Sequence, residues 1–114
     1  MTEETRDPSQ LPAATAVNLP ALIEYQDGAV VSRTLVKKKT CTLTLFAFDA
    51  GQALSEHTAP FDAIVQILDG TVELTIGGAS VPARAGETVR LPANVPHAVL
   101  ATSKFKMLLL MVRE

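Results

Sequence analysis

Two histidines are the residues of this chain best suited to chemistry. His57 and His97 are its only histidines, and they lie in different parts of the sequence. A neutral imidazole is a common metal ligand, and an imidazole also titrates near neutral pH, where it acts as a general base or acid. Two imidazoles share either task only if the fold brings their rings to one point. Their function therefore depends on the elements that carry them.

The chain is a series of short apolar segments separated by turn residues. In "TVELTI" polar and apolar residues alternate without exception, which is typical of a strand with one buried face. Asp69-Gly70 is a hairpin signal, because both residue types tolerate positive φ, and Gly77-Gly78 marks a further turn. Strands are expected over residues 29–36, 41–48, 63–68, 71–76, 88–92, 97–102 and 105–112, and residues 19–25 are expected to form a short helical turn or a strand.

These segments predict one all-β domain, a sandwich or a small barrel, over residues 19–114. A length of 114 residues is ordinary for a single domain, and 47% hydrophobic residues favour a compact core. Residues 1–18 contain Pro8, Pro12 and several small polar residues, so we expect a flexible N-terminal arm there.

Composition excludes several functional classes. A net charge of −2 provides no basic surface for nucleic acid. The longest apolar run, residues 107–112, is far too short to span a bilayer. The polar N-terminus has no apolar stretch that resembles a signal peptide, so we expect a cytoplasmic protein. A single cysteine excludes an internal disulfide.

Two motifs give the chain a family resemblance. The first has a glycine, five residues, a His-x-His pair, a glutamate and a closing glycine. Here Gly51, His57 and Gly70 keep their places, whereas Ala59 and Ala63 occupy the positions of the second histidine and the glutamate. The second motif has a glycine, five residues, Pro-x-Gly, two residues and a histidine. It is kept by the segment from Gly86 through "LPANVPHAV" to His97, with Asn94 in place of the middle glycine.

In these motifs the chain resembles the cupins, small β-barrels of jelly-roll type, over residues 36–112. The resemblance implies a double-stranded β-helix, or jelly-roll barrel, with both histidines facing its interior. It also implies a divalent metal (Zn, Fe, Mn, Ni or Cu), for which His57 and His97 are the two remaining ligands of the usual four. Such a metal would need water, a substrate or a carboxylate such as Glu56 or Asp62 to complete its shell.

The same geometry predicts a pocket inside the barrel. Residues i and i+2 of a strand share a face, so neighbouring strands line the interior with alternate side chains. Ala59 and Ala63 leave space where larger ligands would lie, and Met107 and Met111 are expected in an apolar wall. The pocket is expected to be lined by His57, His97, Ala59, Ala63, Val65, Ile67 and Met107.

Three functions remain open on this basis. The first is binding of a small molecule in the pocket, with the histidines bonded to each other, to Gln66 or to water. The second is a metal-dependent enzyme of the dioxygenase, isomerase or decarboxylase type, which the cupin resemblance implies. The third is a metal-free enzyme that uses a histidine as general base. A homodimer is also expected, with residues 19–25 and 29–36 lying across the partner's sheet.

Overall fold

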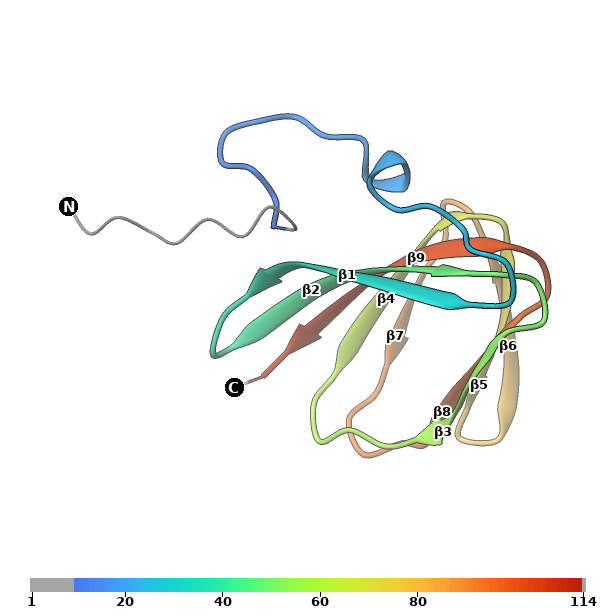
Figure 1. Ribbon diagram of the computed structural model, residues 1–114. Helices are drawn as coiled ribbons and strands as arrows, with labels where there is room; N and C mark the ends of the chain where they lie inside the picture. The colour runs from blue at the N-terminus through green and yellow to red at the C-terminus, as the bar shows by residue number, and fades with distance from the viewer. Residues whose placement is uncertain (1–9, 114) are drawn as a thin grey trace.

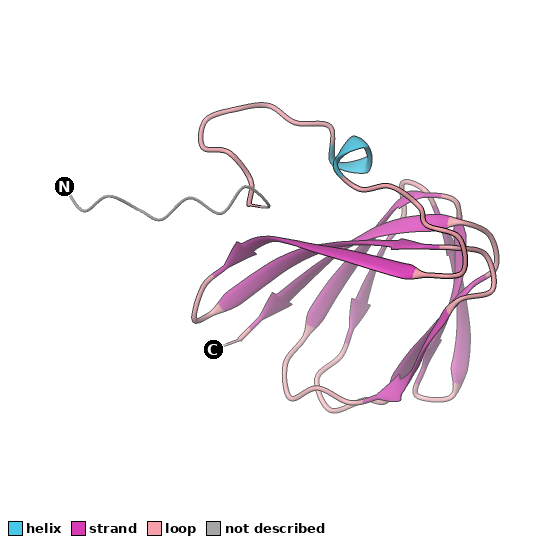
Figure 2. Cartoon of the chain, viewed as in Figure 1, coloured by secondary structure: helices cyan, strands magenta, loops and turns pink. Residues whose placement is uncertain are grey.

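Within residues 10–113, which the computed structural model describes, nine strands form two antiparallel sheets (Figures 1 and 2). The larger sheet has the order β1 (Val30–Lys37), β2 (Cys41–Phe48), β9 (Phe105–Val112), β4 (Ala63–Asp69) and β7 (Thr88–Leu91). The smaller has the order β3 (Ala53–His57), β8 (His97–Ala101), β5 (Thr71–Ile76) and β6 (Ala79–Arg84). A 3-10 turn, η1 (Leu19–Leu22), precedes them.

The all-β jelly roll predicted from the sequence is confirmed. Each of the seven expected strands is present, with its ends within one residue of the expectation. Strands β3 and β6 are additional. Both lie at an edge of the smaller sheet, where burial is slight and the alternation of apolar residues is weak. Pro82 lies within β6, a position that an edge strand tolerates because one side of its backbone pairs with no neighbour.

One turn prediction is wrong. Asp69-Gly70 does not close a hairpin, because β4 belongs to the larger sheet and β5 to the smaller, and the two strands do not pair. The chain instead crosses from one sheet to the other at this point. The true hairpin is at Gly77-Gly78, which joins β5 to β6 with φ of 58° and 83°. Positive φ at both central residues is the geometry of a tight two-residue hairpin.

The main core lies between the two sheets. Alternate residues of β4, β5 and β9 point inward, as their sequence pattern predicts, and Val72 and Leu74 of β5 are each only 1% exposed. At its centre the rings of Phe48 and Phe105 stack with centroids 4.6 Å apart. This core holds the two sheets together and fixes the direction in which each inward side chain points.

Residues 19–25 cover part of the outer face of the larger sheet, and Figure 1 shows η1 on that side of it. Ile23 packs there against Leu35 and Leu45, which are fully buried. Lys106 Nζ donates to the carbonyl oxygen of Pro20 at 2.7 Å, and the Tyr25 hydroxyl donates to Asp69 Oδ2 at 2.5 Å.

Residues 19–25 and 29–36 are the segments expected to lie across a partner's sheet in a homodimer. Both segments pack on this chain's own sheet, because β1 pairs with β2 along its length and so holds the preceding segment close to that sheet's outer face. The homodimer itself stays a prediction. Of the expected flexible arm, residues 1–9 lie outside the described part, and the Leu11 amide donates to the Leu35 carbonyl at 3.0 Å. No helix among the described residues is long and apolar enough to cross a membrane.

Candidate functional site

Strands β3 and β8 bring the two histidines side by side. His57 is the last residue of β3 and His97 the first of β8, and the two are paired across the antiparallel ladder. Their Nε2 atoms are 3.0 Å apart, within hydrogen-bond distance, and the ring centroids are 4.3 Å apart with the planes at 72°. The two imidazoles therefore meet at one point.

The Nδ1 atom of each ring also contacts a backbone carbonyl oxygen. His57 Nδ1 lies 2.9 Å from the carbonyl oxygen of Ser55, and His97 Nδ1 lies 3.3 Å from that of Val95. A carbonyl oxygen only accepts hydrogen bonds, so each contact is bonding when Nδ1 carries the hydrogen. This arrangement directs both Nε2 atoms toward each other.

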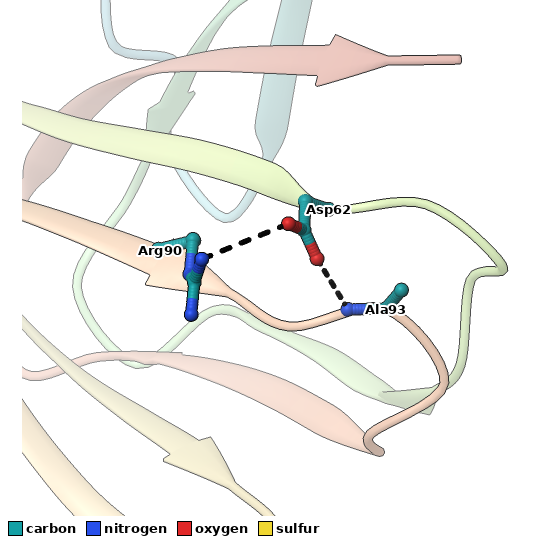
Figure 3. Close-up of polar contacts among 3 residues, drawn as sticks. All are labelled: Asp62, Arg90 and Ala93. Carbon is teal, nitrogen blue, oxygen red and sulfur yellow. Dashed lines mark hydrogen bonds and ion pairs between the residues drawn. The ribbon is translucent and has the colours of Figure 1, made fainter. Parts of the chain in front are cut away.

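The loop that precedes His97 is fastened to the loop that follows His57. Asp62 Oδ1 accepts a hydrogen bond of 2.8 Å from the Ala93 amide, and Asp62 Oδ2 lies 3.9 Å from Arg90 Nη1 (Figure 3). The Asn94 amide donates to the carbonyl oxygen of Ala59 at 2.8 Å. The Asp62 carboxylate, one candidate for completing a metal shell, is therefore engaged with the loop rather than with the imidazoles.

Asn94 adopts a left-handed backbone conformation in this loop, with φ of 64°. Glycine takes this conformation freely, asparagine tolerates it, and a β-branched residue is strained by it. We expect Asn94→Gly to change the free energy of unfolding by less than about 1 kcal/mol and Asn94→Val to lower it by about 1–3 kcal/mol. Urea unfolding of the two variants measures the difference, and equal stability would contradict the assigned backbone conformation.

A cavity opens beside the histidine pair, between the two sheets. Its volume is about 100 Å³. The only polar side chains among its lining residues are His57 and His97. The rest of its wall is aliphatic or thioether: Leu54, Ala59, Ala63, Val65, Leu91, Val99, Met107, Leu109 and Met111. A larger but more open hollow of about 250 Å³ lies over β5 and β6, lined partly by Glu73, Arg84 and Glu87, and it contains neither histidine.

Six of the seven residues expected to line the pocket do so: His57, His97, Ala59, Ala63, Val65 and Met107. The prediction for Ile67 is wrong, because Ile67 is not among the lining residues. It shares the inward face of β4 with Ala63, but it lies four residues further along the strand, about 13 Å away. There its amide donates to the Glu87 carbonyl at 2.9 Å, and its side chain, 1% exposed, fills the core at the far end of the barrel.

Ala59 reaches the cavity differently from the expectation. Strand β3 ends at His57, and a register shift lies between Leu54 and His57, so Ala59 belongs to a loop and does not share a strand face with the histidine. Sequence reasoning also missed four lining residues, Leu54, Leu91, Val99 and Leu109. The signal for Val99 was available, because it lies two residues after His97 and so shares its face.

The two imidazoles lie in different surroundings. His97 is 7% exposed, whereas His57 is exposed at the cavity's edge. Burial lowers the pKa of His97, and the charge of His57 lowers it further, while the hydrogen bond to the Val95 carbonyl opposes both effects. His97 is therefore the member of the pair that resists a positive charge.

This depressed pKa predicts that the protein loses stability as the pH falls below 6.5. In the unfolded chain His97 takes up a proton near its ordinary pKa of 6.5, and in the folded chain only at a lower pH. Between these values the unfolded state binds more protons, so the free energy of unfolding decreases as the pH decreases. Above 6.5 His97 is neutral in both states. Urea unfolding at pH near 7.5 and near 5.5 measures the decrease, and an equal decrease in His97→Gln would refute its assignment to His97.

The donor atoms do not fit a resident metal ion of the usual kind. Within residues 10–113 no group of three or more histidine, cysteine, aspartate or glutamate side chains is placed to hold a metal. A zinc site in a protein takes three or four such ligands, and the pair supplies two. The cavity wall beside the imidazoles is apolar rather than acidic.

The family profile described as "Cupin domain" matches residues 44–113, more than half of the chain. The chain is a cupin. The matched region includes both histidines, the loop from Pro92 to Pro96, and all the strands that line the cavity. None of the proteins with curated functions matches this cupin.

Solved structures show the same fold. A conserved protein of unknown function from Streptococcus pyogenes is 34% identical, with a TM-score of 0.87 over 92% of both chains. A cupin 2 conserved barrel domain protein from Leptotrichia buccalis is 44% identical over 85% of this chain and 47% of its own, with a TM-score of 0.83. A cupin superfamily protein from Desulfitobacterium hafniense is 27% identical, with a TM-score of 0.86 over 92% of this chain and 96% of its own. A salicylate 1,2-dioxygenase, 14% identical, shares the fold alone.

Proposed function

We propose that this cupin binds a small, largely apolar molecule in the cavity between its sheets, with the polar end of that molecule against the histidine pair. The observation that carries the proposal is the composition of the cavity wall, in which two converging imidazoles are the only polar side chains among eleven lining residues. An apolar cavity with a few convergent polar groups is the usual form of a small-molecule site.

The size of the cavity limits the ligand. Cavities of about 150 Å³ lined by aliphatic side chains accept a molecule of benzene's size. A volume of about 100 Å³ therefore suits a branched or cyclic group of roughly four or five carbons. Ala59 and Ala63 create this space, because larger side chains at those positions would fill it.

The histidine pair gives the ligand its orientation. The two Nε2 atoms meet 3.0 Å apart in the cavity wall, and the Nδ1 contacts with Ser55 and Val95 hold the rings in this position. A ligand with one polar group and one apolar group is thus held at both ends. Binding at a fixed orientation is the property that a sensor, a carrier and an enzyme all require, and we propose only the binding step.

Methyl NMR tests the proposal directly. The chain has three methionines, of which Met107 and Met111 line the cavity. We expect titration of methyl-labelled protein with 3-methylbutanamide to shift the signals of both residues with a saturable, one-site dependence. Signals that stay constant up to about 10 mM amide, a concentration that would detect even millimolar affinity, would overturn the proposal.

A further inference from the structure

Part of the outer face of the larger sheet carries aliphatic side chains that belong to neither core. Ile64, Leu110 and Val112 alternate with residues that line the cavity, so they point outward. Ile64 and Leu110 are paired across β4 and β9, and Val112 follows on the same face of β9. Among the described residues neither hydrophobic cluster contains these three side chains, and Val112 is 44% exposed. They form an open patch beside the area that residues 19–25 cover.

The segment before η1 is mostly apolar and exposed. Residues 12–18, with the sequence PAATAVN, are all exposed, and Figure 1 shows them as a loop that stands away from the sheet. Leu11 and Leu19, on either side of this 12–18 loop, pack in the outer cluster and anchor it. Large hydrophobic side chains are exposed at three positions of the described chain: Val17 in the loop, Val112 in the open patch and Leu100 on β8. Fixing an exposed apolar loop costs conformational entropy that its own contacts do not offset, so a surface that covers it would stabilise it.

The two ends of this outer face differ in charge. The end with the open patch is basic, because the three lysines of residues 37–39 are exposed and Arg113 donates to a carbonyl oxygen of that turn at 3.2 Å. The segment that covers the other end carries Glu24 and Asp27, both exposed. Two lysines of that end lie over the Tyr25 ring instead: Lys104 and Lys106. A face with opposite charge at its two ends is complementary to a second copy of itself turned end for end.

We propose that this outer face pairs with the same face of a second copy in a twofold dimer, with the 12–18 loop of each copy lying on the open patch of the other. A twofold axis perpendicular to the face exchanges its two ends. The raised end of one copy then meets the flat, basic end of its partner, and the exposed valines of loop and patch are covered together. Residues 1–9 offer little apolar surface for the patch, because Met1 is the only large apolar residue among them. This dimer does not depend on the proposed function.

The mass of the full-length protein in solution tests the dimer. Light scattering at roughly 50 μM chain is expected to give twice the mass of one chain, since micromolar affinity suffices at that concentration. Val112→Glu is expected to raise the dimer dissociation constant about a hundredfold or more, because the twofold axis places two unpaired charges in the interface. A monomeric unsubstituted protein would leave the open patch to residues 1–9 or to another protein and would overturn the proposal.

Leu100→Glu is the matched control. Leu100 is 43% exposed on β8, and it follows Val99 of the cavity wall, so it points outward from the smaller sheet. We expect this variant to keep the mass of a dimer. Equal dissociation of both variants, or a dimer that Val112→Glu leaves intact, would show that the contact lies on another surface, and either result overturns the proposal.

Paramagnetic broadening between copies locates the loop without a charge in the interface. A nitroxide is attached to Ala16→Cys in a chain whose one native cysteine is removed by Cys41→Ser, and this protein is mixed with ¹⁵N-labelled Cys41→Ser protein. Only contacts between copies then broaden the observed signals. We expect the amide signals of Leu110 and Val112 to lose most of their intensity and that of Leu100 to keep it. A spectrum in which Leu110 and Val112 keep their intensity would show that the loop does not lie on the partner's patch.

Discussion

Gly70→Ala is expected to destabilise the protein by about 3 kcal/mol or more, the largest effect of any single substitution considered for this fold. Gly70 lies at the crossing from β4 to β5 with φ of 73°. An alanine Cβ there would lie 1.9 Å from the carbonyl oxygen of Lys104 and 2.9 Å from its carbonyl carbon. Both atoms belong to the backbone, next to the start of β9, so the clash is relieved only by shifting a core strand.

Gly78→Ala is the matched control. Gly78 also has positive φ, 83°, but an alanine Cβ at this position would meet no atom within 4 Å. Only the backbone strain remains, about 1–2 kcal/mol. Urea unfolding of the two variants measures the contrast. Equal losses of stability would mean that the close approach of Lys104 to Gly70 does not exist in solution.

Ala63→Leu is expected to reduce binding of 3-methylbutanamide at least tenfold while the protein stays folded. Ala63 is 4% exposed and lines the cavity, so the three added carbons occupy the space proposed for the ligand. Filling an existing cavity adds apolar contacts and strains the surroundings less than overpacking a dense core, which costs about 1–3 kcal/mol. The amide titration followed on the Met107 and Met111 methyl signals measures the loss.

Gln66→Met tests whether the loss is specific to the cavity. Gln66 lies on the same strand, but it is exposed and its side chain is on the outer face of the larger sheet. We expect unchanged amide affinity in this variant. If Ala63→Leu binds as tightly as the unsubstituted protein, the ligand lies outside the cavity and the proposed site is wrong.

The strands were predictable because their signal is local. A strand with one buried face alternates apolar and polar residues, and "TVELTI" does so over its whole length, so β5 could be placed to the residue. Strand β3 carries no such alternation, because it lies at an edge and most of its residues are exposed. Whether the two strands that flank a turn pair with each other is not determined by local sequence either. Asp69-Gly70 has the residues of a hairpin, yet the packing of two sheets makes it a crossing.

The site was predictable in part for the same reason. The spacing of the two motifs predicted that both histidines face the same cavity. The alternation of side chains along a strand predicted that Ala63, Val65 and Met107 lie beside them. The alternation of side chains shows which face of a strand a residue lies on, but not how far along the barrel it lies. Ile67 was therefore predicted in the pocket although it lies in the core. The carbonyl contacts of both Nδ1 atoms depend on the local course of two loops, which no spacing in the sequence encodes.

The most direct test of the central claim is the set of nuclear Overhauser contacts between the methyl groups of bound 3-methylbutanamide and the protein. We predict contacts to the methyl groups of Met107 and Met111 and to a ring proton of His97, which line one cavity. Contacts to Thr71 and Val72 instead, in the open hollow over β5 and β6, would place the ligand elsewhere and contradict the account.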